Sequence, residues 1–129
     1  MAIGKIYCGC CAYKRVNGYF KIGMTMQGVG TRASQIRKTD TGFKILDFVK
    51  FPNISKEKLM FIEGYVRLVM STAEGLTYDS YSLDHFCFKA ANNNDMKQKA
   101  KAYAALVKKA AIDGEKLANK ILENPLTNA

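Results

Sequence analysis

The sequence lacks any apolar run close to the roughly 20 residues that a membrane-spanning helix needs. Its first five residues also lack the charged stretch and the following apolar run of a secretion signal. Internal repeats and low-complexity tracts are missing as well. The composition, with 48% hydrophobic and 24% charged residues, is that of an ordinary soluble globular protein. We therefore expect a cytoplasmic protein with no membrane partner.

Patterns for disulfides and metals are scarce too. The chain has four cysteines and a single histidine, His85. Cys8, Cys10 and Cys11 crowd together too closely to staple a fold, so we expect reduced thiols. Zinc held by these cysteines with His85 and Cys87 is disfavoured, because Cys11 points to the opposite strand face from Cys8 and Cys10. Small buried thiols in a core are the expectation.

Acidic residues are outnumbered by basic ones. The chain carries 20 lysines and arginines against 11 aspartates and glutamates, which gives a formal net charge of +9. Such a charge favours polyanionic partners, because each basic group that meets a phosphate releases a condensed counterion. The basic residues are spread along the chain, and no helix joins them to a wide aromatic face as a membrane-surface helix would. Nucleic acid is therefore the expected partner.

A length of 129 residues is typical of one domain. Lys5 to Ala12 and Gly18 to Met24 are rich in apolar and aromatic residues, and the Asn17-Gly18 pair tolerates positive φ. These segments predict a β-hairpin. Phe43 to Phe51 alternates well enough to be a third strand. The core should therefore contain a small antiparallel three-stranded sheet.

Helices are predicted by caps and apolar periodicity. Thr31 can cap a short helix from Arg32 to about Lys38, and Ser55 can cap a second one. The second helix carries a buried stripe at helical spacing, formed by Leu59, Ile62, Val66 and Val69. Between this helix and the tail, the segment from Asp84 to Phe88 is predicted to be short and extended.

The tail is predicted to be helical from Met96 to about Leu122, with Asp95 as its cap. Gly114 leaves open whether this segment is one helix or two. The apolar positions of the tail recur in alternating four- and three-residue steps, a seam formed by Met96, Ala100, Tyr103, Val107, Ala110, Gly114, Leu117 and Ile121. The predicted fold is thus α+β, a three-stranded sheet flanked by helices over residues 1–90, followed by a basic helical extension over residues 91–129.

Several segments together resemble the GIY-YIG endonuclease family. Gly4-Lys5-Ile6-Tyr7 and Phe20-Lys21-Ile22-Gly23-Met24-Thr25 resemble the two halves of its signature. Arg32 follows at about the distance of the family arginine, and Glu63 follows within the second predicted helix. Asp84-His85-Phe86 looks like an element of phage-type branches, which points to a phage or mobile-element origin and to the host cytoplasm. The resemblance covers about residues 3 to 90.

The resemblance implies a metal-dependent endonuclease that hydrolyses phosphodiester bonds in DNA with low sequence selectivity. Glu63 would hold Mg²⁺ (or Mn²⁺), because magnesium prefers oxygen ligands and keeps much of its hydration. Arg32 would clamp the scissile phosphate with its planar fork of donors. Tyr7 would bind or deprotonate the attacking water. His85 would carry protons, because the ordinary pKa of imidazole is about 6.5.

Lys21 stands where the family has its second tyrosine, and Ile36 replaces a hydrogen-bonding residue one turn after the arginine. Lys21 would then position water or supply a cationic field. The alternative is an inactive site, which leaves a catalytically degenerate nucleic-acid binding module. The other residues also have plainer interpretations: Tyr7 and Tyr19 as ordinary strand aromatics, Arg32 in an ion pair, His85 as a structural histidine, and Glu63 with Arg67 as a surface ion pair.

The tail carries lysines on one face and the apolar seam on another. Lys97, Lys101 and Lys108 are the predicted contacts to a DNA backbone, which would raise affinity without reading sequence. A solvated face is the plainer interpretation. The seam could instead pair two subunits into a homodimer. A protein that docks on another protein through its helical tail is the remaining alternative.

Overall fold

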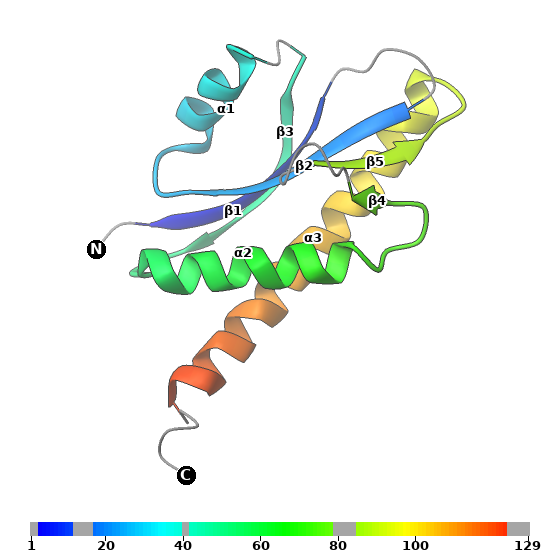
Figure 1. Ribbon diagram of the computed structural model, residues 1–129. Helices are drawn as coiled ribbons and strands as arrows, with labels where there is room; N and C mark the ends of the chain where they lie inside the picture. Colours follow the sequence, from blue (N-terminus) through cyan, green and yellow to red (C-terminus); the bar gives the residue numbers. More distant parts are fainter. Residues whose placement is uncertain (1–2, 12–16, 40–41, 79–84, 124–129) are drawn as a thin grey trace.

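The computed structural model describes residues 3–11, 17–39, 42–78 and 85–123. Within these ranges the chain forms a five-stranded antiparallel sheet and three helices (Figure 1). The strands are β1 (Gly4–Cys11), β2 (Asn17–Thr25), β3 (Lys44–Phe51), β4 (Thr77–Tyr78) and β5 (His85–Lys89). The helices are α1 (Val29–Arg37), α2 (Lys56–Met70) and α3 (Asn93–Glu123). The α+β class expected from the sequence is confirmed.

The predicted three-stranded sheet is too small. Its strands β1, β2 and β3 are present, but the order across the whole sheet is β3-β1-β2-β5-β4. The short extended segment predicted near residue 85 is β5, which pairs antiparallel with β2 and with the two-residue β4. Periodicity identifies β5 as extended but cannot show which strand it pairs with, because pairing joins segments far apart in the chain. Asp84 and residues 14–16 of the predicted turn lie outside the described residues.

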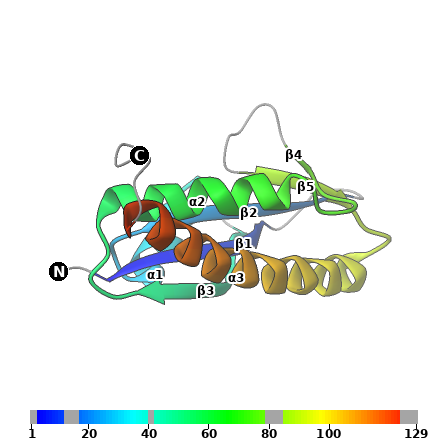
Figure 2. The ribbon, with the colours of Figure 1, turned by 90° about the horizontal axis from the view of Figure 1, so that it is seen from below.

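Helices cover both faces of the sheet. Viewed from below in Figure 2, α2 and α3 lie in front of the strands and α1 lies behind them. The alternation of side chains along β1 divides the core accordingly. Ile6 and Cys8 pack beneath α2 and α3, whereas Tyr7 points to the other face and packs with Ala33 and Ile36 of α1. We refer to these two sides as the α2/α3 face and the α1 face.

Two of the predicted caps differ in outcome. Ser55 caps α2 as expected, because its hydroxyl accepts a hydrogen bond of 3.1 Å from the amide of Lys58. Thr31 does not cap α1, which begins earlier: Gly28 is the cap residue and makes no side-chain cap bond. The predicted stripe on α2 is buried at Leu59, Ile62 and Val66, and Val69 is partly buried against the same core.

The tail forms one continuous helix, which answers the question left open by Gly114. A β-carbon at this glycine would lie 2.9 Å from a ring carbon of Tyr65, so the residue allows α3 to pack closely on α2. The predicted start of α3 is slightly late. Asn92 accepts a hydrogen bond of 2.8 Å from the amide of Asp95, and the carboxylate of Asp95 accepts one from the amide of Ala91. These reciprocal bonds resemble a capping box.

The apolar seam predicted for the tail is buried at the start of α3, but its last residues are exposed. Ala100, Tyr103, Val107 and Ala110 are buried in the same core as β1 and β2. Leu117 and Ile121 are 37% and 47% exposed, whereas Ala118 is buried. A straight helix has 3.6 residues per turn, so side chains that repeat every seven residues rotate by about 20° around the helix per heptad. This rotation turns Leu117 and Ile121 away from the core and brings Ala118 toward it.

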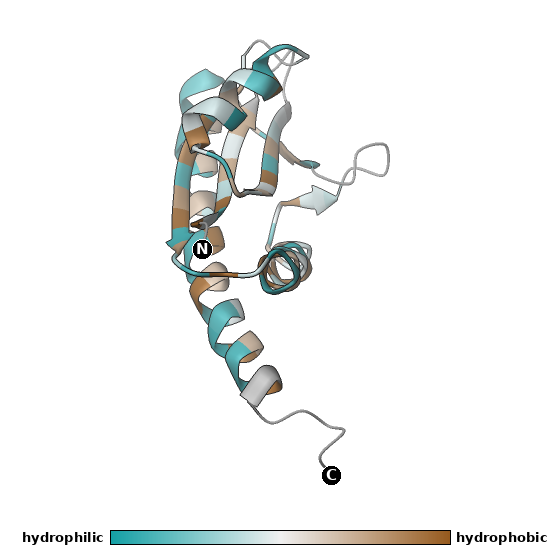
Figure 3. Cartoon of the chain, turned by 90° about the vertical axis from the view of Figure 1, so that its left-hand side faces the viewer, coloured by the Kyte–Doolittle hydropathy of each residue, from teal (hydrophilic) through white to brown (hydrophobic). Residues whose placement is uncertain are grey.

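Because the buried part of this seam packs within the chain, it is not available to pair two subunits. The last turns of α3 extend beyond the sheet (Figures 1 and 3). No helix within the described ranges is both long and apolar enough to cross a bilayer.

Candidate active site

Tyr7 and Arg32 meet on the α1 face. Tyr7 is 1% exposed, and its hydroxyl accepts a hydrogen bond of 3.3 Å from Nε of Arg32. Arg32 stands in the first turns of α1, and its Nη1 donates to Oε1 of Gln35 at 3.2 Å. Two of its nitrogens are thus held by acceptors within the chain. The guanidinium is therefore oriented before any ligand arrives.

Gly23 explains how Tyr7 comes to lie at this point. It is the direct partner of Tyr7 across the β1–β2 ladder. A β-carbon at Gly23 would overlap the hydroxyl and the adjacent ring carbon of Tyr7. The phenol ring therefore lies across the backbone of β2, which only a glycine permits. This gives a physical reason for a glycine at position 23.

Two lysines that were not predicted from the sequence also lie beside Tyr7. Lys5 and Lys50 face each other across β1 and β3, two residues from the Tyr7–Phe48 pair. Directly opposed residues of an antiparallel ladder, and residues two apart, share one face. Nζ of Lys5 donates to the carbonyl of Gln27 at 2.9 Å, and Nζ of Lys50 lies 5.9 Å from the ring centroid of Phe48. Spacing from Tyr7 could have identified Lys5, whereas Lys50 required the strand register.

Lys21 and His85 share the α1 face with Tyr7. Lys21 lies two residues before Gly23 on β2, is 6% exposed, and pairs with His85 of β5. The ring of His85 meets that of Tyr19 edge-on, with centroids 6.4 Å apart. The four residues predicted to be catalytic therefore lie on one side of the sheet, with Tyr7 and Arg32 in direct contact.

Glu63 approaches from the other side. It belongs to α2, which packs on the α2/α3 face, so Glu63 does not share the face that carries Tyr7 and Arg32. Oε2 of Glu63 lies 3.5 Å from Nη2 of Arg67, and the same Nη2 donates to the carbonyl of Ile22 at 3.3 Å. Ile22 directly precedes Gly23. Glu63 is thus linked through Arg67 to the stretch of β2 that Tyr7 covers.

The ion pair of Glu63 and Arg67 is the plainer interpretation offered for these residues, and the contact exists. It is not fully exposed, since the side chain of Glu63 is 16% exposed and that of Arg67 is 25% exposed. For a metal, the donor type fits: one carboxylate oxygen with water suits Mg²⁺ or Mn²⁺. Among the described residues no three of His, Cys, Asp and Glu gather as metal ligands. A cation here would therefore have Glu63 and mostly water around it.

The cysteines follow the expectation for buried thiols in part. Cys8 is 1% exposed, and burial, assisted by the nearby charge of Asp47, raises the pKa of its thiol to about 12. Cys10 and Cys87 are of intermediate exposure. The side chain of Cys11 lies outside the described residues. At neutral pH the Cys8 thiol is a neutral core group rather than a nucleophile.

The tail lysines do not join this cluster. Lys97, Lys101 and Lys108 are exposed on α3, in the layer opposite α1. Nζ of Lys108 lies 3.8 Å from a carboxylate oxygen of Asp47. Lys97 and Lys101 line a cavity of about 600 Å³ together with Lys44.

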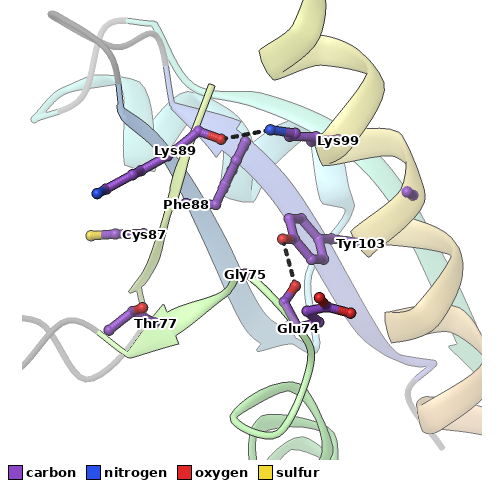
Figure 4. A pocket seen from close by; sticks show the side chains of 9 residues that line it. Glu74, Gly75, Thr77, Cys87, Phe88, Lys89, Lys99 and Tyr103 are labelled. Atoms are coloured by element: carbon purple, nitrogen blue, oxygen red, sulfur yellow. Dashed lines mark hydrogen bonds between the residues drawn. The ribbon is translucent and has the colours of Figure 1, made fainter. Parts of the chain in front are cut away.

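A second cavity, of about 550 Å³, opens between β5 and α3 (Figure 4). There the hydroxyl of Tyr103 donates to the carbonyl of Glu74 at 3.0 Å, and Nζ of Lys99 donates to the carbonyl of Lys89 at 3.0 Å. These bonds tie α3 to the sheet and to the loop after α2. Both cavities belong to the α2/α3 side of the molecule.

Comparisons of the chain with protein-family models, with curated proteins and with solved structures find no match. The resemblance to GIY-YIG endonucleases therefore depends on the motif residues of the sequence alone.

Proposed function

We propose that the chain is a metal-dependent endonuclease that hydrolyses phosphodiester bonds in DNA with low sequence selectivity. The observation that carries this proposal is the hydrogen bond of 3.3 Å between Arg32 and Tyr7, which are 25 residues apart. Phosphodiester hydrolysis needs an oriented water and cationic groups at the phosphoryl oxygens. A phenol oxygen held against a guanidinium supplies a water contact and a phosphate contact side by side.

In this proposal Arg32 binds the scissile phosphate with the donors that Tyr7 and Gln35 leave to it. Its planar fork stabilises the negative charge that grows in the transition state. Lys5 and Lys50 hold the neighbouring phosphates on the same face. Lys97, Lys101 and Lys108 add contacts to the DNA backbone from the opposite layer, without reading sequence.

Tyr7 and Lys21 position the attacking water, and His85, which faces Lys21 across the ladder, moves the proton. Glu63 would hold the divalent cation from the layer opposite Tyr7 and Arg32, beside the stretch of β2 that Arg67 contacts. When bound, Mg²⁺ or Mn²⁺ neutralises phosphate charge and acidifies a coordinated water.

A plasmid nicking assay with Mg²⁺ or Mn²⁺, repeated with a chelator, tests this proposal. Removing one preorganised donor commonly slows a reaction by roughly a hundredfold or more. Arg32→Lys and Tyr7→Phe should each lower cleavage by about that factor while binding to the same DNA persists. Glu63→Gln should remove the dependence on metal together with the activity. Thermal unfolding of each variant serves as the control for folding.

A nucleic-acid binding module without catalysis is the second candidate. It is favoured by Lys21, which replaces the second motif tyrosine and is nearly buried, and by Glu63, which pairs with Arg67 and comes from the layer opposite Tyr7 and Arg32. If the wild-type protein binds DNA but never cuts it with either metal, this candidate replaces the endonuclease. Docking of a partner protein through the tail lacks a comparable observation, because the start of the tail seam packs within the chain.

A further inference from the structure

Arg67 contacts the proposed metal ligand and the backbone of the site with a single nitrogen. Its Nη2 lies 3.5 Å from Oε2 of Glu63 and 3.3 Å from the carbonyl oxygen of Ile22. Glu63 and Arg67 are one helical turn apart and follow the buried residues Ile62 and Val66 directly. The packing of α2 on the sheet therefore fixes where both side chains start. The contact is built into the fold rather than left to two flexible surface side chains.

A guanidinium and a divalent cation compete for the same carboxylate. A bound Mg²⁺ lies about 2 Å from its carboxylate oxygen, so it would stand within a few ångströms of Arg67 in the present position. The two positive charges would repel each other strongly, because both side chains are largely removed from water. Arg67 has a second acceptor in Ile22, whose carbonyl is held by the β-ladder. Arg67 can therefore release Glu63 and keep a hydrogen bond.

We propose that Arg67 is an internal cation that neutralises Glu63 in the metal-free protein and is displaced when the divalent metal binds. Arg67 then sets the metal concentration at which the site fills. This inference rests on the proposed function, in which Glu63 holds the metal. Removal of the charge at position 67 should tighten metal binding, since the guanidinium then no longer competes for the carboxylate.

Binding of Mn²⁺ to the full chain, followed by the decrease of the free-ion signal in electron paramagnetic resonance, tests the proposal without any measurement of cleavage. Arg67→Met keeps much of the apolar length of the side chain and removes its charge. It should bind Mn²⁺ roughly tenfold more tightly than the wild type, given how strongly partly buried pairs interact. Arg67→Lys, which keeps a point charge without the planar fork, should fall between the two.

Lys109→Met is the matched control. Lys109 and Asp113 form an ion pair of 3.2 Å with the same four-residue spacing, on the exposed surface of α3. This change should leave Mn²⁺ affinity as it is in the wild type. Glu63→Gln should remove the binding that Arg67→Met strengthens.

Thermal unfolding gives a second measurement, which still tests the proposal if Arg67→Met is less stable than the wild type. Arg67→Met leaves the carboxylate of Glu63 without this cation and should melt at a lower temperature than the wild type in chelator. Added Mn²⁺ should then raise its melting temperature by more than it raises that of the wild type, because tighter binding of a ligand to the folded state stabilises it more. Arg67→Lys extends the same comparison to a variant that keeps its charge.

The outcomes separate this inference from the proposed function. If Glu63-dependent Mn²⁺ binding exists but Arg67→Met leaves it unchanged or weakens it, the displaced-cation proposal is wrong and the endonuclease proposal stands. If no variant shows Mn²⁺ binding that Glu63→Gln removes, Glu63 is not the metal ligand, and both proposals lose their metal site.

Discussion

The phenol of Tyr7 lies across the backbone of Gly23, its partner on the neighbouring strand, so closely that a β-carbon there would overlap its hydroxyl. This contact determines where the hydroxyl meets Arg32. A methyl group at position 23 would push the phenol away from the guanidinium while leaving both functional groups chemically intact. The relationship therefore allows the site geometry to be changed while every proposed reacting side chain is retained.

Gly23→Ala should lower DNA cleavage at least tenfold, because displacement of a reacting group by about an ångström is costly. Gly30→Ala is the control, since it also adds one methyl near the site but meets nothing within 4 Å. Both variants are assayed for nicking and for DNA affinity. Unchanged cleavage by Gly23→Ala would mean that the position of Tyr7 does not matter to the reaction.

Two helical glycines should respond in opposite directions to the same change. Gly64 lies on the exposed side of α2 with nothing within 4 Å of a β-carbon, so Gly64→Ala should stabilise the fold by about 1 kcal/mol. Gly114→Ala gains the same helix propensity but must displace the ring of Tyr65, and overpacking costs about 1–3 kcal/mol. Urea unfolding of both variants measures the difference. Equal stabilisation of the two would contradict the close packing of α2 on α3.

The sequence predicts the local elements better than their long-range arrangement. The hairpin, β3, the Ser55 cap and the tail helix follow from alternation, capping and period, which act over a few residues. The partner of β5 and the face that α2 covers depend on contacts between distant segments, which no local pattern contains. The predicted Thr31 cap is wrong because α1 follows Gly28 without a side-chain cap bond, although threonine is a common cap residue.

The same distinction applies to the site. Strand alternation and the start of α1 place Tyr7, Lys21, Arg32 and His85 on one face of the sheet. Order cannot reveal that Glu63 comes from the opposite layer. The sequence also shows Glu63 and Arg67 at pairing distance on a helix. It does not show that Arg67 reaches β2 as well, because that contact spans 45 residues.

The Cys8 thiol makes stability depend on alkaline pH. Burial raises the pKa of this thiol from 9.0 to about 12, so the unfolded chain releases its proton at a lower pH than the folded chain does. The contribution of this difference to the unfolding free energy is complete below pH 9. As the pH rises from 9 toward 12, the unfolding free energy falls by about 1 kcal/mol per pH unit. Lysines and tyrosines titrate in the same range, so the wild type is compared with Cys8→Ala. The wild-type unfolding free energy should fall more steeply, and parallel curves would contradict the assignment.

The reactivity of the thiols offers a separate check on the same burial. Iodoacetamide at pH 8 should label Cys10 and Cys87 well before Cys8, because alkylation requires an accessible thiolate. Peptide mass spectrometry identifies the labelled positions. In denaturant the difference should disappear, and early labelling of Cys8 under native conditions would show that it is not buried.

Lysines on the two sides of the sheet should differ in their effects on DNA binding and DNA cleavage. Lys5 and Lys50 flank Tyr7 on the α1 face, whereas Lys97 and Lys101 stand on α3 in the opposite layer. Lys5→Gln with Lys50→Gln should lower the slope of log affinity against log salt by roughly one unit for each phosphate that is no longer neutralised. The same double change should also slow cleavage at saturating DNA, because these lysines hold the phosphates beside the scissile one.

The matched double change, Lys97→Gln with Lys101→Gln, removes the same number of charges from the other layer. It should lower affinity and the salt slope but leave cleavage at saturating DNA unchanged, because these lysines contact a stretch of backbone away from the scissile phosphate. Fluorescence anisotropy across a salt series and single-turnover nicking provide the two measurements. Should the α3 pair slow cleavage as strongly as the Lys5 and Lys50 pair, the cleaved strand passes over the α2/α3 face, and the Tyr7–Arg32 cluster is not where the phosphate is bound.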